Sequence, residues 1–194
     1  CLTMIMSFAS VVNAEHYSNF TDVKPDSWYY EDVDNAVRLG IINGKTENLF
    51  APASSLTGSE AIKLAACIHQ LYVEGSVSLK SGFPWYKPYV DYCKENGIIA
   101  EDKNYPIDRP ITRGDFVVIF ANALPDKALK EVNYVPDGSI PDVPDNDAIY
   151  KMYRAGIVTG VDALHNCNPT ANITRAEVAV IVARMMDPSK RIRF

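Results

Sequence analysis

A chain of 194 residues that is 47% hydrophobic and 22% charged has enough apolar material for a folded core. Its formal net charge of -5 argues against a nucleic-acid partner, because such proteins usually carry a basic patch. No run of like charges occurs, and the short basic end from Lys190 to Phe194 is expected to be a solvated tail.

The N-terminal stretch, residues 1–14, is uncharged and mostly apolar. Ala14 at its end, with Val12 two positions earlier, is typical of a signal-peptidase site. We therefore expect residues 1–14 to be the remnant of a signal peptide and Glu15 to be the mature N-terminus. The stretch is too short to span a bilayer, so no membrane insertion of the mature chain is expected. A retained apolar helix and a lipidated Cys1 remain as alternatives.

A repeated pattern of helix and loop signals divides the rest of the chain into three copies. Each copy opens with apolar residues at helical spacing, which predicts an amphipathic helix. A glycine follows each of these helices, and glycine most easily adopts the left-handed conformation just past a helix end. The copies span residues 20–72, 83–124 and 138–187, the first helices are expected over 27–39, 85–96 and 146–155, and the glycines are Gly40, Gly97 and Gly156.

A second helix in each copy is predicted to begin after a threonine that is followed three residues later by a carboxylate. The pairs are Thr57 with Glu60, Thr112 with Asp115 and Thr174 with Glu177. The first and third are full capping boxes, and the shorter aspartate makes the second one weaker. Two amphipathic helices cannot bury their apolar faces alone. We therefore expect a mostly all-α fold in which residues 20–187 form one cooperative unit, with function where the copies meet.

The cysteines and histidines show neither a disulfide framework nor metal-ligand spacing. Cys67 and Cys93 lie on apolar helical faces and are expected to be small core residues, although a single disulfide remains open. No metal and no cofactor are expected. The sequence has no nucleophile elbow or phosphate loop, and the carboxylates of the three caps occupy equivalent positions. We therefore expect no enzyme activity, with a glycosidase-like carboxylate pair as the remote alternative.

The repeated pattern resembles the S-layer homology domain. The opening of copy one carries the resemblance in Phe20-x-Asp22-Val23, Trp28-Tyr29, Gly40-Ile41-Ile42-x-Gly44 and Phe50-x-Pro52. The family's Thr-Arg-Ala-Glu signature is complete at residues 174–177. Copy two has Thr112-Arg113-Gly114-Asp115, and copy one has Thr57-Gly58-Ser59-Glu60, without the arginine. The resemblance covers residues 20 to 187.

This resemblance implies three tandem copies folded as a pseudo-threefold helical bundle. It also implies an exported protein of the cell wall that binds secondary cell-wall polysaccharide, often bearing a pyruvate ketal, in grooves between neighbouring copies. An anchored cargo domain or a surface-layer protein would be a further partner. A structural or protein-interaction module of the envelope, without glycan binding, is the alternative, because no copy carries the complete set of family residues.

The candidate ligand-binding residues follow from the same resemblance. They are Arg175, Arg113, Trp28, Trp85, Asp22, Asp142, Gly44 and Gly160. A guanidinium can donate two parallel hydrogen bonds to a sugar carboxylate, and free N–H groups in a helix's first turn also favour an anion. The tryptophan rings can stack on a sugar or plug the core, and the aspartates can contact ligand or fix a turn. Gly58→Arg is expected to create a site if residue 58 has ordinary helical backbone angles.

Overall fold

The computed structural model describes residues 20–194, so the expected signal-peptide remnant and the mature start at Glu15 lie outside the described residues. Within this part the fold is helical, as predicted, and isolated backbone bridges take the place of a sheet. The α-helices are α1 (Tyr30–Arg38), α2 (Gly58–Glu74), α3 (Lys87–Glu95), α4 (Arg113–Asn122), α5 (Asp147–Arg154) and α6 (Arg175–Met186). Two 3-10 turns, η1 (Asp126–Ala128) and η2 (Pro188–Lys190), complete the fold.

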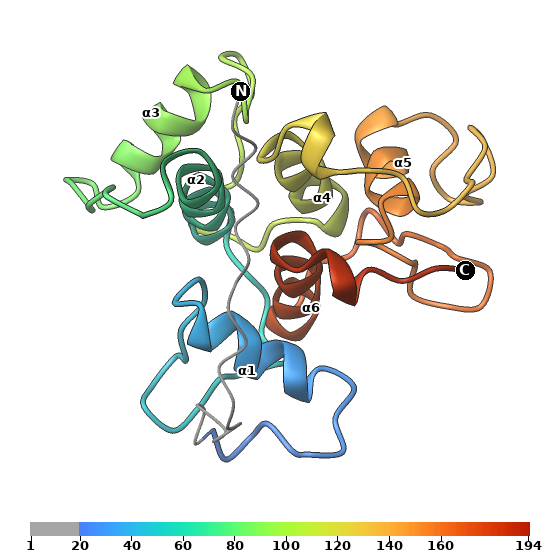
Figure 1. Cartoon of the computed structure of the whole chain (residues 1–194). Helices are drawn as coiled ribbons and strands as arrows, with labels where there is room; N and C mark the ends of the chain where they lie inside the picture. Colours follow the sequence, from blue (N-terminus) through green and yellow to red (C-terminus); the bar gives the residue numbers. More distant parts are fainter. Residues whose placement is uncertain (1–19) are drawn as a thin grey trace, which may run out of the picture.

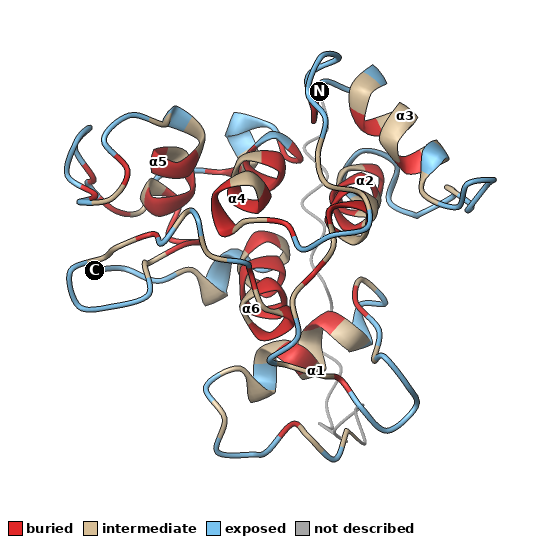
Figure 2. Ribbon diagram, turned by 180° about the vertical axis from the view of Figure 1, so that it is seen from behind, coloured by how far each residue is buried: buried red, intermediate tan, exposed pale blue. Residues whose placement is uncertain are grey.

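The second helices of the copies, α2, α4 and α6, lie together at the centre, and the first helices, α1, α3 and α5, lie outside them (Figure 1). Each outer helix packs against an inner helix from a different copy: α3 on α2, α5 on α4, and α1 on α6. The inner helices consist mostly of buried residues (Figure 2). The copies are therefore interlocked, because each one supplies half of two different helix pairs.

A closed ring of backbone hydrogen bonds joins the copies just before the inner helices begin. Ile111 N donates to Leu56 O at 2.9 Å, Ile173 N to Ile111 O at 3.3 Å, and Leu56 N to Ile173 O at 3.3 Å. All three residues are buried, so these bonds are shielded from water. Each of the three occupies the position directly before the cap threonine of its copy.

The predicted caps form at the start of each inner helix. Thr57 with Glu60 and Thr174 with Glu177 make full capping boxes, with both reciprocal hydrogen bonds present. In α4 the Thr112 side chain accepts from the N–H of the aspartate three residues later, and no reciprocal bond forms. The shorter side chain thus makes the weaker cap, as predicted.

The first-turn N–H groups of the inner helices are not free, which corrects the expectation that they favour an anion. Arg113 N donates to Ala171 O at 2.7 Å, and Arg175 N donates to Ser54 O at 2.8 Å. Gly58 N donates to loop carbonyls of the second copy. The helix starts are therefore satisfied by the loops of neighbouring copies, which adds to the attachment between copies.

The outer helices end as predicted and begin slightly later than predicted. Gly40, Gly97 and Gly156 follow them with φ values of 68°, 67° and 69°. The late starts place Trp28 and Trp85 before their helices rather than in the first turn.

The basic C-terminal segment is docked, which corrects the expectation of a solvated tail. Lys190 pairs with Asp32 of α1 at 3.0 Å. Arg191 Nη2 donates to Ala128 O at 2.7 Å, and Ile192 N donates to Gly156 O at 2.9 Å. The segment thereby connects the third copy to the first.

Two further expectations concern the membrane and the cysteines. Among residues 20–194, no helix has the length and apolar character needed to cross a bilayer. The cysteines of this part are free thiols; Cys93 is buried, as predicted, and Cys67 is only half-buried.

Candidate ligand-binding groove

A groove of about 380 Å³ forms where the three predicted copies meet. Arg113 of the second copy lies in it beside Glu177, and Thr159-Gly160 of the third copy form part of its wall. Trp28 of the first copy lines the same groove. The structure therefore brings together three of the predicted site residues: Arg113, Trp28 and Gly160.

Arg113 is held in the wall of this groove by an ion pair. Its Nη1 donates to Oε1 of Glu177 at 3.1 Å, and its side chain is 7% exposed. The other oxygen of Glu177 accepts from Thr174 N at 2.8 Å and thus closes the cap of α6. Arg113 Nε is buried and has no hydrogen-bond partner among the described residues. A buried donor of this kind is costly to leave unpaired, and the thiol of Cys167 is a close neighbour of this guanidinium.

The loop that forms the groove wall is fixed by glycine and by His165. Gly160 has φ 87°, and a Cβ at this position would lie 2.6 Å from the His165 backbone. Nδ1 of His165 is 2.8 Å from Thr159 O. Burial raises the pKa of the Tyr153 phenol, which stays protonated and donates to His165 O at 3.1 Å. Gly160 is thus required for the shape of the wall.

Trp28 is exposed rather than a core plug. Its side chain is 66% exposed and makes an edge contact with Tyr29, with the ring centroids 5.3 Å apart. An exposed indole beside a polar groove offers a flat apolar face and an N–H donor, the combination that suits recognition of an amphipathic ligand.

Arg184 also lines the groove, and the sequence reasoning missed it. Its Nη1 donates to Ile157 O at 3.1 Å, and burial lowers the pKa of its guanidinium without making it neutral. The residue lies in the last turn of α6, outside every family motif. A cation on the otherwise apolar stripe of α6 was the available signal.

Arg175 occupies a more closed setting than Arg113. Its Nε donates to Phe50 O at 2.8 Å and its Nη2 to Asn43 O, while the guanidinium lies 4.6 Å from the centre of the Phe50 ring. Gly44 lies beside Asn43, and a Cβ there would meet the Phe20 ring at 2.4 Å. Arg175 therefore links α6 to the loop of the first copy.

Trp85, the other predicted aromatic residue, is 39% exposed and lies near α2. Lys63 of α2 places its Nζ 6.0 Å from the centre of the Trp85 ring. The indole is therefore neither a core plug nor a member of the Arg113 groove.

Asp22 and Asp142 fix turns in the first and third copies, one of the two roles the sequence left open. The carboxylate of Asp22 accepts from the N–H groups of Phe50 and Ala51 at 2.9 and 2.7 Å. Asp142 accepts from Cys167 and Asn168 at 2.8 and 2.6 Å. Neither lines the Arg113 groove.

The position of Gly58 cannot hold an arginine, which corrects the expectation for Gly58→Arg. A Cβ on Gly58 would lie 2.2 Å from the carbonyl oxygen of Pro106 and 3.0 Å from its carbon. Those are backbone atoms, so the contact cannot be relieved by a side-chain rotation. An arginine at residue 58 would therefore require the backbone at Pro106 to shift.

Two segments of the chain, residues 19–62 and 80–117, match the sequence model of the S-layer homology domain. These segments are S-layer homology domains. They correspond to the first and second copies of the repeat, and Arg113 of the groove lies in the second.

Among curated proteins, the chain is similar to the surface-layer 125 kDa protein of Lysinibacillus sphaericus, at 36% identity over 62% of this chain and 11% of that protein. It is 26% identical to an amylopullulanase of Thermoanaerobacterium thermosulfurigenes over 95% of this chain and 10% of the enzyme. It is 24% identical to the S-layer protein sap of Bacillus anthracis over 85% of this chain and 21% of that protein. The chain thus spans about a tenth to a fifth of the length of these relatives.

Proposed function

We propose that the chain is a non-covalent cell-wall anchoring module that binds an anionic secondary cell-wall polysaccharide. The S-layer homology domains and the surface-layer relatives indicate a protein of the cell surface. The similarity to an amylopullulanase over only a tenth of that enzyme fits a non-catalytic module that also accompanies enzymes as cargo.

Residues 138–187 form the third copy in this proposal, and the three copies have pseudo-threefold symmetry. The support comes from equivalent contacts at equivalent positions. Asp142 clamps its loop as Asp22 does, and the ring through Leu56, Ile111 and Ile173 repeats one hydrogen bond three times. Each inner helix also receives an outer helix from another copy.

The groove at Arg113 is the observation that carries the binding proposal. The groove contains the Arg113 cation, whose buried Nε has no hydrogen-bond partner among the described residues, and the exposed indole of Trp28. Its wall includes the loop at Gly160, where the backbone is not covered by a side chain. A pyruvate ketal on the sugar would bring a carboxylate, which Arg113 can bind by charge-assisted hydrogen bonds while the sugar ring stacks on Trp28. Arg175 with Gly44 forms the second candidate site, in which Arg175 must leave a backbone carbonyl to meet a ligand.

The test is sedimentation with cell-wall sacculi of Lysinibacillus sphaericus, before and after the secondary polymer is removed by acid extraction. We expect binding to untreated sacculi, loss of binding after extraction, and weaker binding at higher salt. Trp28→Ala should lower the affinity at least about tenfold. Phe83→Ala is the matched control, because Phe83 is 99% exposed and lies outside the groove. Equal sedimentation with extracted sacculi would reject the glycan as partner.

Charge recognition is tested separately with a purified pyruvylated hexosamine and its neutral methyl ester. Arg113→Gln should reduce the preference for the free acid over the ester. If the second site also binds the carboxylate, Arg175→Gln should likewise reduce the preference for the free acid over the ester. A folded Arg113→Gln protein that retains the full preference for the acid would remove Arg113 from the site.

The alternative, a protein-interaction module without glycan binding, is favoured by the hydrogen bonds that already engage Arg175, Asp22 and Asp142. All three serve loop structure here. Sedimentation that survives polymer extraction but requires another envelope protein would support this alternative.

A further inference from the structure

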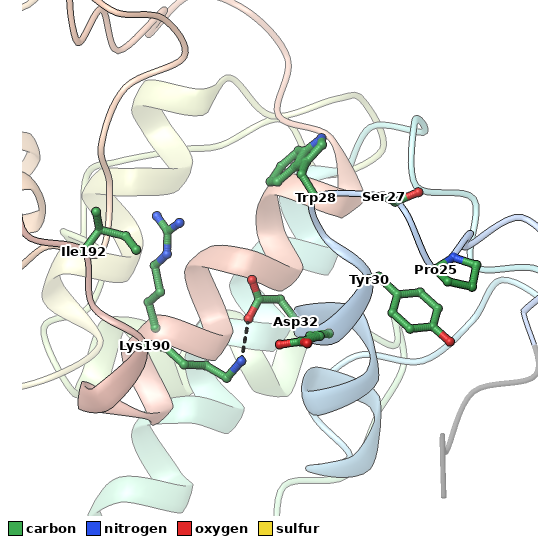
Figure 3. Close-up of a pocket in the computed structure, with 9 residues that line it drawn as sticks. Pro25, Ser27, Trp28, Tyr30, Asp32, Lys190 and Ile192 are labelled. Carbon is green, nitrogen blue, oxygen red and sulfur yellow. Dashed lines mark hydrogen bonds and ion pairs between the residues drawn. The ribbon is translucent and has the colours of Figure 1, made fainter. Parts of the chain in front are cut away.

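A second cavity adjoins the groove at Trp28. Its volume is about 320 Å³, and Asp32 of α1 together with Lys190 and Ile192 of the C-terminal segment lines it (Figure 3). Trp28 and Arg184 line both this cavity and the Arg113 groove. Each volume lies near the lower end of the roughly 300–1,000 Å³ typical of small-molecule sites. The two hollows share Trp28 and Arg184 in their walls, and we call this adjacent pair of cavities the trough.

Charged side chains follow one another along this trough. Arg113 pairs with Glu177 in the groove, and Lys190 pairs with Asp32 in the second cavity, as the dashed line in Figure 3 shows. Arg184 lies between these pairs and makes no ion pair with any carboxylate of residues 20–194. Its hydrogen bond to Ile157 O uses one of five N–H groups, so most of its donors remain available.

Arg184 also distinguishes the third copy from the other two. The residues at the same distance from the cap threonine are Cys67 in α2 and Asn122 in α4. Helix pairing places α1, with Trp28 just before it, against α6. The C-terminal segment closes the other side through Lys190 and Ile192. The trough therefore depends on the contact of α1 and the C-terminal segment with α6, and the pattern shared by the copies does not produce it.

We infer that this trough binds two or more consecutive sugars of an acidic polysaccharide, with Arg184 binding an acidic group at their junction. The inference rests on the proposed function and extends it. The terminal sugar lies in the Arg113 groove, and the next sugar lies beyond Trp28 against Lys190 and Ile192. The carboxylate of Asp32 acts on this guanidinium electrostatically but forms its ion pair with Lys190. Arg184 can therefore bind an anion without breaking an ion pair of its own.

The test compares the affinity of the full chain for two probes by calorimetric titration. One probe is a pyruvylated hexosamine monosaccharide, and the other is a wall fragment in which the same sugar is extended by two more, the first of which carries an acidic group. The parent should bind the extended fragment about tenfold more tightly. Arg184→Gln should reduce this ratio to near one, and so should Ile192→Trp, which fills the second cavity without removing a charge. Arg193→Gln is the matched control, because Arg193 is exposed and lines neither cavity.

The outcomes separate this inference from the proposed function. Binding of the monosaccharide with no gain from extension overturns the inference and leaves the proposed function standing. A gain that survives both Arg184→Gln and Ile192→Trp also overturns it. If neither probe binds, the proposed function fails and the inference fails with it. The unfolding midpoint of each variant shows whether that variant is folded. If Arg184→Gln does not fold, the affinity ratio of Ile192→Trp alone tests the inference.

Discussion

Arg113 Nη1 and Glu177 Oε1 lie 3.1 Å apart, although α4 carries the first residue and α6 the second. The same carboxylate caps α6 through Thr174. One side chain therefore joins the start of a helix, the contact between two copies and the wall of the ligand groove. Changes at this carboxylate are expected to affect all three.

Glu177→Gln should lower the free energy of unfolding by about 2 kcal/mol, because it leaves the guanidinium of Arg113 without its charged partner. Glutamine can still close the cap, so the effect reports mainly on the ion pair. Glu60→Gln is the matched control: its partner Lys45 is 43% exposed, and the expected loss is below about 1 kcal/mol. Urea unfolding at pH 7 measures both, and equal losses would contradict the assignment.

Stability should fall in acid partly through Glu60. Burial opposes its ionisation, but hydrogen bonds from Lys45 and Thr57 outweigh burial and hold its pKa below the ordinary 4.5. A lowered pKa stabilises the fold above about pH 4.5, and this contribution is lost as the pH falls through the folded-state value. The difference in unfolding midpoint between parent and Glu60→Gln should therefore shrink below pH 4.5. A constant difference between pH 7 and pH 3 would argue against this, and the exposed Glu47→Gln serves as control.

Gly58→Ala should destabilise the protein by about 1–3 kcal/mol, because its Cβ would collide with the Pro106 carbonyl. Helix propensity alone predicts a gain of about 1 kcal/mol, so the sign of the effect is diagnostic. Gly114→Ala should cost less, since its Cβ meets Pro169 at 3.0 Å. Thermal or urea unfolding measures both variants. An unchanged or raised midpoint for Gly58→Ala would show that the loop of copy two yields.

The described chain should unfold in a single transition. Ile173→Ala removes side-chain packing at the ring of backbone hydrogen bonds. It should lower the free energy of unfolding of the whole unit by about 2–5 kcal/mol. Trp28 and Trp85 are fluorescent reporters in two different copies. Variants that retain only one indole, Trp85→Phe and Trp28→Phe, should give coincident transitions. Separate midpoints would mean that the copies fold independently.

Local structure was predictable from the sequence at positions where the residue type strongly favours one conformation or one cap. Gly40 sits at a helix end with positive φ, and Thr57 and Glu60 close a capping box, because both signals act within a few residues. The all-α class followed from such signals. The partner of each helix did not, since amphipathic stripes show that a helix has a buried face and not which helix covers it.

The site was predictable only in part, because the sequence does not reveal which protein groups already form hydrogen bonds with a candidate side chain. The structure places Arg113 and Trp28 in one groove, yet Arg175 bonds two backbone carbonyls. The importance of Arg184 depends on α1 packing against α6, a contact between opposite ends of the chain. No local pattern carries that information.

The interlocked helix pairs have a consequence for how such a chain can be rearranged. The order of copies is linear along the polypeptide but circular in space, because α1 of the first copy completes the pair with α6 of the last. Joining residue 194 to residue 20 through a linker and opening the chain at 75–82 would keep every described helix beside its present partner. The fold thus depends on the cyclic order of the helix pairs and not on which pair comes first in the chain.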